Sequence, residues 1–302
     1  MSEKQLDVLI NEVIKQLANE GLISRKSTDH LNDSKPFIKN EFLPIKIDLV
    51  DPTTEKLRTT PRVNHPRDSE ALPALMATTT ARLGVGRAGV RPRIEALLLF
   101  QSDFAVSQDA LNKEVDPTIL DTLGFFSVNT LIHGGKTDYL LRPDLGRSLS
   151  KEAVNIINQR CIKKPDIQIC VGDGLSATAV EANIKKIFPV LVAGCQNAGL
   201  STGTPFFIQN CRVGVMNDIG DIIQPEVLIL LIGERPGLGR AESMSAYMAY
   251  HPNHGQTDAN REVICNIFDN GGTNPLEAGA YAIRLAQEMI KKKGSGVSQK
   301  TN

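Results

Sequence analysis

The chain has 302 residues, 41% of them hydrophobic, and its 34 basic residues balance 34 acidic ones, giving a formal net charge of zero at pH 7. This length suits about two domains with a sizeable core, and the balanced charge argues against a broad electrostatic grip on nucleic acid or anionic lipid. The longest uninterrupted apolar run, Val227 to Ile232, falls far below the roughly 18 residues that span a bilayer. We therefore expect neither a nucleic-acid partner nor a membrane span.

The first 23 residues predict an amphipathic helix, because apolar side chains recur at helical spacing and charged ones fill the opposite face. The apolar positions are Leu6, Leu9, Ile10, Val13, Ile14 and Leu17. This segment does not resemble a secretory signal, so we expect an intracellular protein. Residues 24–67 are polar and rich in proline, which is typical of a linker. The helix is either a docking peptide for another protein or a helix that packs back on its own chain.

Residues 68–160 predict a helical domain, with helices expected over Ala71–Leu83 and Ile94–Ser102. Residues 161–302 predict an α/β domain, because continuous apolar strands alternate with helices there, which is typical of a parallel sheet covered on both faces. The expected strands are Asp166–Val171, Thr204–Ile208, Arg212–Val215, Val227–Ile232 and Glu262–Ile267. Ser176 is expected to cap the helix after the first strand, and Pro275 to begin the last helix, which Gly294 would end.

The segment Gly84–Gly89 matches the GxGxxG pattern of dinucleotide-binding turns letter for letter. That pattern binds a dinucleotide where an apolar strand precedes it and a helix follows at once, and neither is expected here. A dinucleotide site is therefore disfavoured. The turn carries Arg82, Arg87, Arg91 and Arg93, which either bind an anion or a partner's carboxylates or are simply solvated.

A second glycine cluster, Gly233–Gly239, follows the most apolar strand of the chain. Ligands of open parallel sheets bind at the carboxyl ends of the strands, so this position favours a site, with Glu234 as a hydrogen-bond acceptor. A purely structural turn is the alternative. The loops Gly172–Gly174, Thr202–Thr204 and Gly271–Thr273 also adjoin expected strands, and together they could frame one crevice.

Catalytic groups are sparse. The five histidines lie mostly in polar stretches, and no HExxH or GxSxG motif is present. The pair His251 and His254 lacks a third residue spaced to complete a metal site. The five cysteines are scattered and never in CxxC spacing, so we expect mostly packed thiols rather than a zinc or disulfide framework. The sequence predicts no catalytic residue, no metal ligand and no self-sufficient catalytic centre.

Five blocks of the chain together resemble the small (light) subunit of ethanolamine ammonia-lyase. These blocks are Thr80–Arg93, Arg142–Arg147, Gly172–Ser176, Gly203–Phe207 and above all Gly233–Gly239. The resemblance runs in order from about Thr79 to Lys293, roughly two thirds of the chain. It implies a Rossmann-like parallel sheet domain after a helical domain, with the N-terminal helix on a flexible linker.

The resemblance also implies an adenosylcobalamin-dependent lyase that converts ethanolamine to acetaldehyde and ammonia. In that family a large subunit holds the substrate and the radical chemistry, and the small subunit completes the cofactor site. The chain has no DxHxxG motif, so the cofactor would be base-on. The family's cobalamin contacts fall on Val213, Glu234 and Val263, with Cys265 as a neighbouring candidate on the same strand face.

The resemblance further implies a location in the cytoplasm within a bacterial microcompartment, with the N-terminal helix docking on its shell or cargo. Two other functions remain open from the residues alone. One is a stand-alone nucleotide-binding oxidoreductase that uses the Gly84–Gly89 turn, and the other is a non-enzymatic scaffold subunit.

Overall fold

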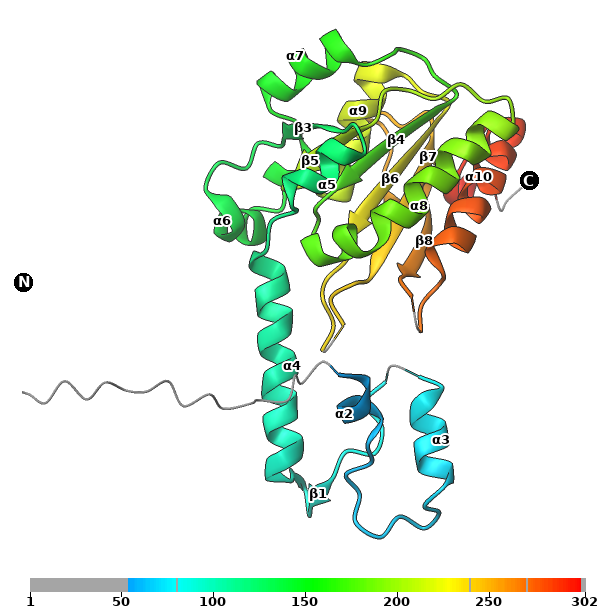
Figure 1. The fold of residues 1–302 in the computed structure, drawn as a ribbon. Helices are drawn as coiled ribbons and strands as arrows, with labels where there is room; N and C mark the ends of the chain where they lie inside the picture. The colour runs from blue at the N-terminus through cyan, green and yellow to red at the C-terminus, as the bar shows by residue number, and fades with distance from the viewer. Residues whose placement is uncertain (1–53, 80, 239, 270, 300–302) are drawn as a thin grey trace, which may run out of the picture. The chain divides into compact units, whose positions relative to one another are not determined.

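The computed structural model describes residues 54–79, 81–238, 240–269 and 271–299. Its central element is a six-stranded sheet (Figure 1). The strand order is β3-β5-β4-β6-β7-β8. The bounds are β3 Phe126–Asn129, β4 Ile167–Gly172, β5 Phe206–Gln209, β6 Val227–Gly233, β7 Met244–Tyr250 and β8 Glu262–Ile267. The expected helix over residues 1–23 and most of the expected linker lie outside the described residues.

The sheet is mixed, which corrects the prediction of a parallel one. Strands β3, β5, β4 and β6 are parallel, whereas β7 runs antiparallel to β6 and β8 antiparallel to β7. The chain leaves β6 at Gly233 and returns at Met244 directly beside it, with Gly233 paired to Met244. A connection this short cannot carry a crossover helix, so the next strand has to reverse direction.

Four of the five expected strands are confirmed, as β4, β5, β6 and β8. The expected strand Arg212–Val215 is wrong, because Val213–Val215 forms a 3-10 helix that leads directly into helix α9, Met216–Ile223. Strands β3 and β7 were not expected. Because β3 belongs to the same sheet, the segment 68–160 contributes to the α/β core, and the boundary at residue 160 stays a prediction.

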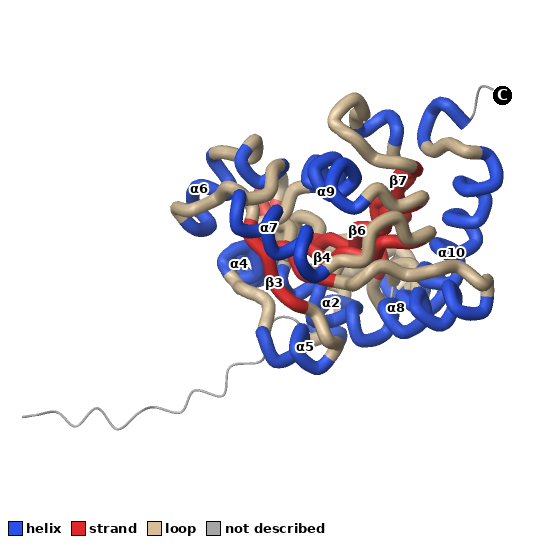
Figure 2. Tube along the Cα trace, turned by 90° about the horizontal axis from the view of Figure 1, so that it is seen from above, coloured by secondary structure: helices blue, strands red, loops and turns tan. Residues whose placement is uncertain are grey.

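Helices cover both faces of the sheet (Figure 2). Helices α8 (Ala177–Asn197) and α10 (Pro275–Lys292) bury one hydrophobic cluster against it, and helices α7 (Lys151–Arg160) and α9 bury a second cluster on the opposite face. All seven residues of β6 are buried, and they lie between the two clusters. The most apolar run of the sequence therefore forms the centre of the sheet, as the hydrophobic effect requires.

The expected helix ends are largely confirmed. The Ser176 hydroxyl accepts a hydrogen bond from the Ala179 backbone N–H at 3.2 Å, so Ser176 caps α8. Helix α10 begins at Pro275 and ends one residue earlier than expected, because Lys293 rather than Gly294 takes the left-handed conformation with φ of 53°.

The chain before the sheet contains short elements and one long helix. These are α2 (Glu55–Thr59, inside the expected linker), α3 (Ala71–Ala77), the hairpin strands β1 (Arg87–Ala88) and β2 (Arg91–Pro92), and α4 (Ile94–Asn112). Helix α3 is shorter and α4 longer than expected. The GxGxxG segment runs into the hairpin instead of a helix, so it lacks the dinucleotide-binding context, as the sequence indicates.

The remaining elements connect these parts. They are α5 (Pro117–Thr122), α6 (Gly135–Leu141) and the 3-10 helices η3 (Leu145–Arg147), η4 (Val213–Val215), η5 (Asp258–Asn260) and η6 (Gly296–Gln299). None of the described helices combines the length and the apolar character that crossing a membrane requires.

Candidate functional site

The carboxyl ends of β4, β5 and β6 meet at one edge of the sheet, because these strands are parallel neighbours. Three of the four glycine loops predicted to frame a crevice lie at this edge. Leu175 N–H donates to the Gly233 carbonyl at 2.9 Å, and Ile267, which pairs with Met244, forms a bridge to Thr273. The fourth loop lies at the opposite edge, because Gly203 N–H donates to the carbonyl of Ile167, where β4 begins.

Gly174 shows why this edge needs glycine. Its φ of +58° lies in the left-handed region, and a Cβ there would collide with the carbonyl oxygen of Gly233. The loop after β4 and the loop after β6 therefore approach each other more closely than side chains at these two positions would allow.

Asp173 ties the end of β4 to the turn after β5. Its buried carboxylate accepts hydrogen bonds from the backbone N–H groups of Asn210 at 2.9 Å and Cys211 at 2.8 Å. Burial raises the pKa of Asp173, and the nearby Lys136 ammonium acts in the opposite direction. The two backbone bonds hold the start of the Asn210–Val213 segment, so Asp173 determines where Val213 begins its 3-10 turn.

Tyr139 of α6 also contacts the Asn210–Val213 segment. Its buried hydroxyl donates to the Cys211 carbonyl at 2.8 Å, and the Arg212 guanidinium lies 4.1 Å from its ring centre and donates to its carbonyl at 3.0 Å. Burial raises the pKa of Tyr139, and the carboxylate of Asp173 adds to that. The Asn210 N–H, both backbone groups of Cys211 and the Arg212 side chain are therefore held in place directly before Val213.

A polar cavity of about 320 Å³ adjoins Asp173 at this edge. Its lining residues share hydrogen-bonding or charged groups, and they include Asn112, Glu114, Asn129, His133, Lys136, Asp173, Gln209 and Asn210. Lys136 donates to the Gly174 carbonyl at 3.4 Å, and burial lowers its pKa. The cavity is small and mostly polar, and it lies at the same edge of the sheet as the glycine loops.

Glu234, the first residue after β6, is held from two sides. Its backbone N–H donates to the Ser243 carbonyl at 3.0 Å, and its Oε1 accepts a hydrogen bond from the Tyr247 hydroxyl at 3.2 Å. Burial, followed by the charge of Glu234, raises the pKa of Tyr247 to about 12. Among the described residues, Oε2 of Glu234 has no hydrogen-bond partner. Glu234 therefore presents an oriented acceptor at the sheet edge.

Val263 of β8 pairs with Tyr247 of β7, so their side chains lie on the same face of the sheet. Val263 is 46% exposed, and Cys265, two residues on, is also exposed. Tyr247 and Val213 both pack against the cluster under α7 and α9. The structure thus brings the predicted contacts Val213, Glu234 and Val263 to one side of the sheet, with Tyr247 between the last two.

Two arginines flank this face. The Arg261 side chain is 5% exposed, pairs with Asp258 and donates to Oδ1 of Asn217 at 3.1 Å. Burial lowers the pKa of Arg261. The Arg147 stem covers Gly214, where a Cβ would collide with it. Tyr247, Arg261 and Arg147 were not predicted as site residues. Their contacts depend on strand register and loop packing, for which the sequence offers no local signal.

The four histidines that the structure describes, His65, His133, His251 and His254, are exposed. His251 lies 3.2 Å from Glu226, and His254 pairs with Asp218 and Asp221. The described residues hold no group of three or more His, Cys, Asp or Glu side chains suited to a metal ion. Four of the five cysteines are buried and Cys265 is exposed, so the prediction of mostly packed thiols is confirmed.

The fold and this edge define a class: an α/β protein with a mixed sheet, at one end of which a positioned carboxylate lies beside apolar side chains. Residues 69–300 match the model of the ethanolamine ammonia-lyase light chain family. The chain is 39% identical over 306 residues to the ethanolamine ammonia-lyase small subunit of Clostridioides difficile (strain 630), covering 99% of this chain and all of that one. It is 38% identical over 305 residues to the subunit of the same name from Clostridium perfringens (strain ATCC 13124), with the same coverage.

The chain therefore belongs to the ethanolamine ammonia-lyase light chain family, and it is a lyase subunit. The resemblance carried by the five sequence blocks is confirmed.

Proposed function

We propose that this chain, with a large catalytic subunit, forms an adenosylcobalamin-dependent ethanolamine ammonia-lyase that converts ethanolamine to acetaldehyde and ammonia. The chain's part is to complete the base-on cofactor site. The observation that carries this role is the joint placement of Glu234 and Val263 around Tyr247. The names of its relatives support the activity and, through the words small subunit, a larger partner.

The residues at the sheet edge fit a cobalamin. A corrin carries amide side chains that donate hydrogen bonds, and Glu234 has an oxygen without a partner among the described residues. Val213 and the exposed Val263 offer apolar surface beside that acceptor, which suits the ring and the dimethylbenzimidazole tail. A positioned carboxylate between apolar groups is the pattern by which proteins orient a large, partly apolar ligand.

When bound, the cofactor supplies homolysis of its carbon–cobalt bond. The chain's own residues bind and orient. Tyr247 holds the Glu234 carboxylate in place through Oε1, and Asp173 and Tyr139 fix the segment that carries Val213. None of these side chains is assigned a proton transfer or a bond to substrate, which agrees with the absence of a catalytic motif in the sequence.

Reconstitution tests the proposal. We expect no ethanolamine deamination from this chain alone, and activity when a large subunit of the family and adenosylcobalamin are added. Deamination by the isolated chain would refute the assigned division of labour.

A Glu234→Ala variant tests the site itself. It should weaken cofactor affinity in the complex by about 1–3 kcal/mol, the cost of a lost hydrogen bond to a desolvated group. Glu242→Ala is the matched control, because Glu242 lies in the same loop and its carboxylate accepts from its own neighbour, Ala241, instead. Equal affinity for the two variants would remove Glu234 from the site.

We also propose that the enzyme is housed in a bacterial microcompartment in the cytoplasm, with residues 1–23 docking on its shell or cargo. The amphipathic pattern of those residues supports this, since a helix on a polar tether cannot bury its own apolar stripe. Deleting residues 1–20 should leave deamination intact and abolish co-sedimentation with the compartment. Retained co-sedimentation would overturn the docking role.

A further inference from the structure

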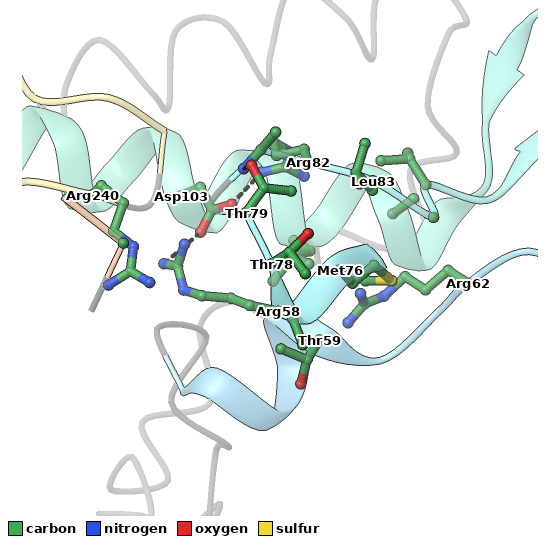
Figure 3. A pocket seen from close by; sticks show the side chains of 17 residues that line it. Arg58, Thr59, Arg62, Met76, Thr78, Thr79, Arg82, Leu83, Asp103 and Arg240 are labelled. Atoms are coloured by element: carbon green, nitrogen blue, oxygen red, sulfur yellow. Dashed lines mark hydrogen bonds and ion pairs between the residues drawn. The ribbon is translucent and has the colours of Figure 1, made fainter. Parts of the chain in front are cut away.

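A second cavity, of about 450 Å³, lies between helices α2, α3 and α4 and the loop that follows β6 (Figure 3). None of the residues proposed to contact cobalamin lines it. Ser107 of α4 donates to the Gly237 carbonyl at 2.7 Å, which fastens the helix to that loop beside the cavity. The cavity is large enough for a small organic molecule, since ligand pockets measure roughly 300–1,000 Å³.

The cavity is strongly cationic. Among the described residues that line it, Arg58, Arg62, Arg82 and Arg240 are basic and Asp103 is the one acid. The Asp103 side chain is buried, with an ion pair to Arg58 at 3.3 Å and another to Arg82. Within the lining, the single carboxylate of Asp103 thus faces two guanidinium groups.

The other two arginines increase the imbalance. Arg62 has a side chain that is 9% exposed, and its nearest carboxylate, 3.6 Å away, belongs to Glu95, which is outside the cavity lining and highly exposed. Arg240 makes no ion pair with a described carboxylate, and its Nε is buried without a hydrogen-bond partner among the described residues. A buried guanidinium nitrogen with no acceptor is costly unless a ligand supplies one.

One wall of the cavity is apolar. Met76, Leu83, Val85, Ala96 and Leu99 line it, and Met76 and Ala96 are buried. Figure 3 shows Arg58 and Arg82 directed at Asp103, with Arg240 on the same side, while Met76 and Leu83 lie toward the other end. Arg62 lies beside Met76 at that end, so an occupant would meet Arg58, Arg82 and Arg240 at one end and hydrocarbon next to a single guanidinium group at the other.

We infer that this cavity is a binding site for a small organic oxyanion, whose phosphate or carboxylate group is held by Arg240 and Arg82 and whose apolar part lies on Met76 and Leu83. Guanidinium groups suit this task, because each offers paired donors that match two oxygens of such an anion. Asp103 holds Arg82 and Arg58 in position and reduces the repulsion between their guanidinium groups. The inference is independent of the cobalamin site.

Titration calorimetry of the full chain tests this with phenyl phosphate, inorganic phosphate and phenol at constant ionic strength. Phenyl phosphate should bind saturably and more tightly than inorganic phosphate, and phenol should not bind measurably. A linear, unsaturable response to phenyl phosphate would overturn the inference, and so would phenol binding as tightly as phenyl phosphate.

Variants locate the binding. Arg240→Gln should weaken phenyl phosphate at least tenfold, and Arg240→Lys less, because it keeps the charge and loses the paired donors. Arg91→Gln is the matched control. Arg91 lies exposed on the hairpin strand β2, outside the cavity lining, and its substitution by glutamine removes the same charge. Equal weakening by Arg240→Gln and Arg91→Gln would mean a non-specific charge effect and would overturn the site. Thermal unfolding without ligand verifies that each variant folds, and the wild-type comparison of the three probes stands without any variant.

Discussion

The Tyr247 hydroxyl donates a hydrogen bond to Oε1 of Glu234 at 3.2 Å, and this contact joins two strands that run in opposite directions. Glu234 follows the carboxyl end of β6, whereas Tyr247 lies within β7, opposite Val263 of β8. The antiparallel strands β7 and β8 therefore bring Tyr247 and the apolar Val263 side chain beside the Glu234 carboxylate.

Removing that hydroxyl tests whether the acceptor needs positioning. Tyr247→Phe should leave the fold intact and weaken cobalamin affinity of the complex about two- to tenfold, since a single hydrogen bond contributes about 0.5–1.5 kcal/mol. The measurement is equilibrium binding followed by cofactor absorbance. Tyr281→Phe on α10 is the matched control and should bind as wild type. If both variants bind as wild type, Tyr247 does not position Glu234.

The pKa of Tyr247 provides a second measurement of the same contact. Its value of about 12 has burial as its first cause and Glu234 as its second. Glu234→Gln should lower that pKa without returning it to the ordinary 10.0, because burial of the ring persists. Ultraviolet-monitored titration of the tyrosines, with Tyr247→Phe used to assign the curve, checks this. An unchanged pKa would mean that the two side chains do not meet in solution.

Cys265 allows the β8 face to be probed chemically. It is the exposed cysteine, whereas burial raises the pKa of Cys161 and Cys195 to about 11 and raises that of Cys170 and Cys211 well above the ordinary value. Because the thiolate is the reactive form, a maleimide at pH 8 should label Cys265 first. Cys265→Ser should abolish that rapid phase.

The same labelling tests the proposed cofactor contact at β8. In the complex with the large subunit, adding cobalamin should slow the Cys265 reaction relative to the complex without it. Equal rates with and without cobalamin would place the cofactor away from Val263 and Cys265.

Asp173→Asn should destabilise the protein by about 1–3 kcal/mol, measured as the free energy of unfolding in urea. The carboxylate accepts two backbone N–H groups, and an amide can accept with its oxygen while its NH2 faces a donor. Relief of the buried charge offsets part of the loss. Asp116→Asn, an exposed cap of α5, is the control and should cost less. A neutral or stabilising Asp173→Asn would mean that the charge, rather than the hydrogen bonds, dominates.

The strand that the sequence predicts most clearly is the one whose apolar residues are continuous. Val227–Ile232 is buried throughout as β6, whereas Glu262–Ile267 matches the bounds of β8 although Ile267 alone of that strand is buried. Strand β7 was missed because its sequence, MSAYMAY, mixes serine and alanine with aromatic residues, and β3 because it is four residues long. Without β7 recognised, nothing in the sequence could indicate that the sheet reverses direction.

The error at Arg212–Val215 has a specific cause. The local pattern suits a strand, but Asp173 binds the N–H groups of Asn210 and Cys211, and Asn210 takes a positive φ of 57°. These long-range contacts turn the chain into the 3-10 helix at Val213. The same limit applies to the site: Glu234 was predictable from its place after β6, whereas Tyr247 meets it only through a strand register that the sequence does not express.

We expect His254 to make the stability of the protein depend on pH. Its hydrogen bond to Asp221 is the first cause that raises its pKa above the ordinary 6.5, and Asp218 adds to it. A histidine whose pKa is raised by folding contributes stability that is fully present below its unfolded value, and that contribution is lost as pH rises through the folded value. The thermal midpoint of the wild type should therefore exceed that of His254→Gln at pH 6, and the difference should shrink by pH 9.

A second variant tests the ion pair directly. Asp221→Asn should lower the His254 pKa measured by NMR. This variant is preferred to Asp218→Asn because Asp218 also accepts a hydrogen bond from the Leu149 N–H at 2.7 Å. A midpoint difference that stays constant between pH 6 and pH 9 would show that the His254 contact is not an ion pair in solution.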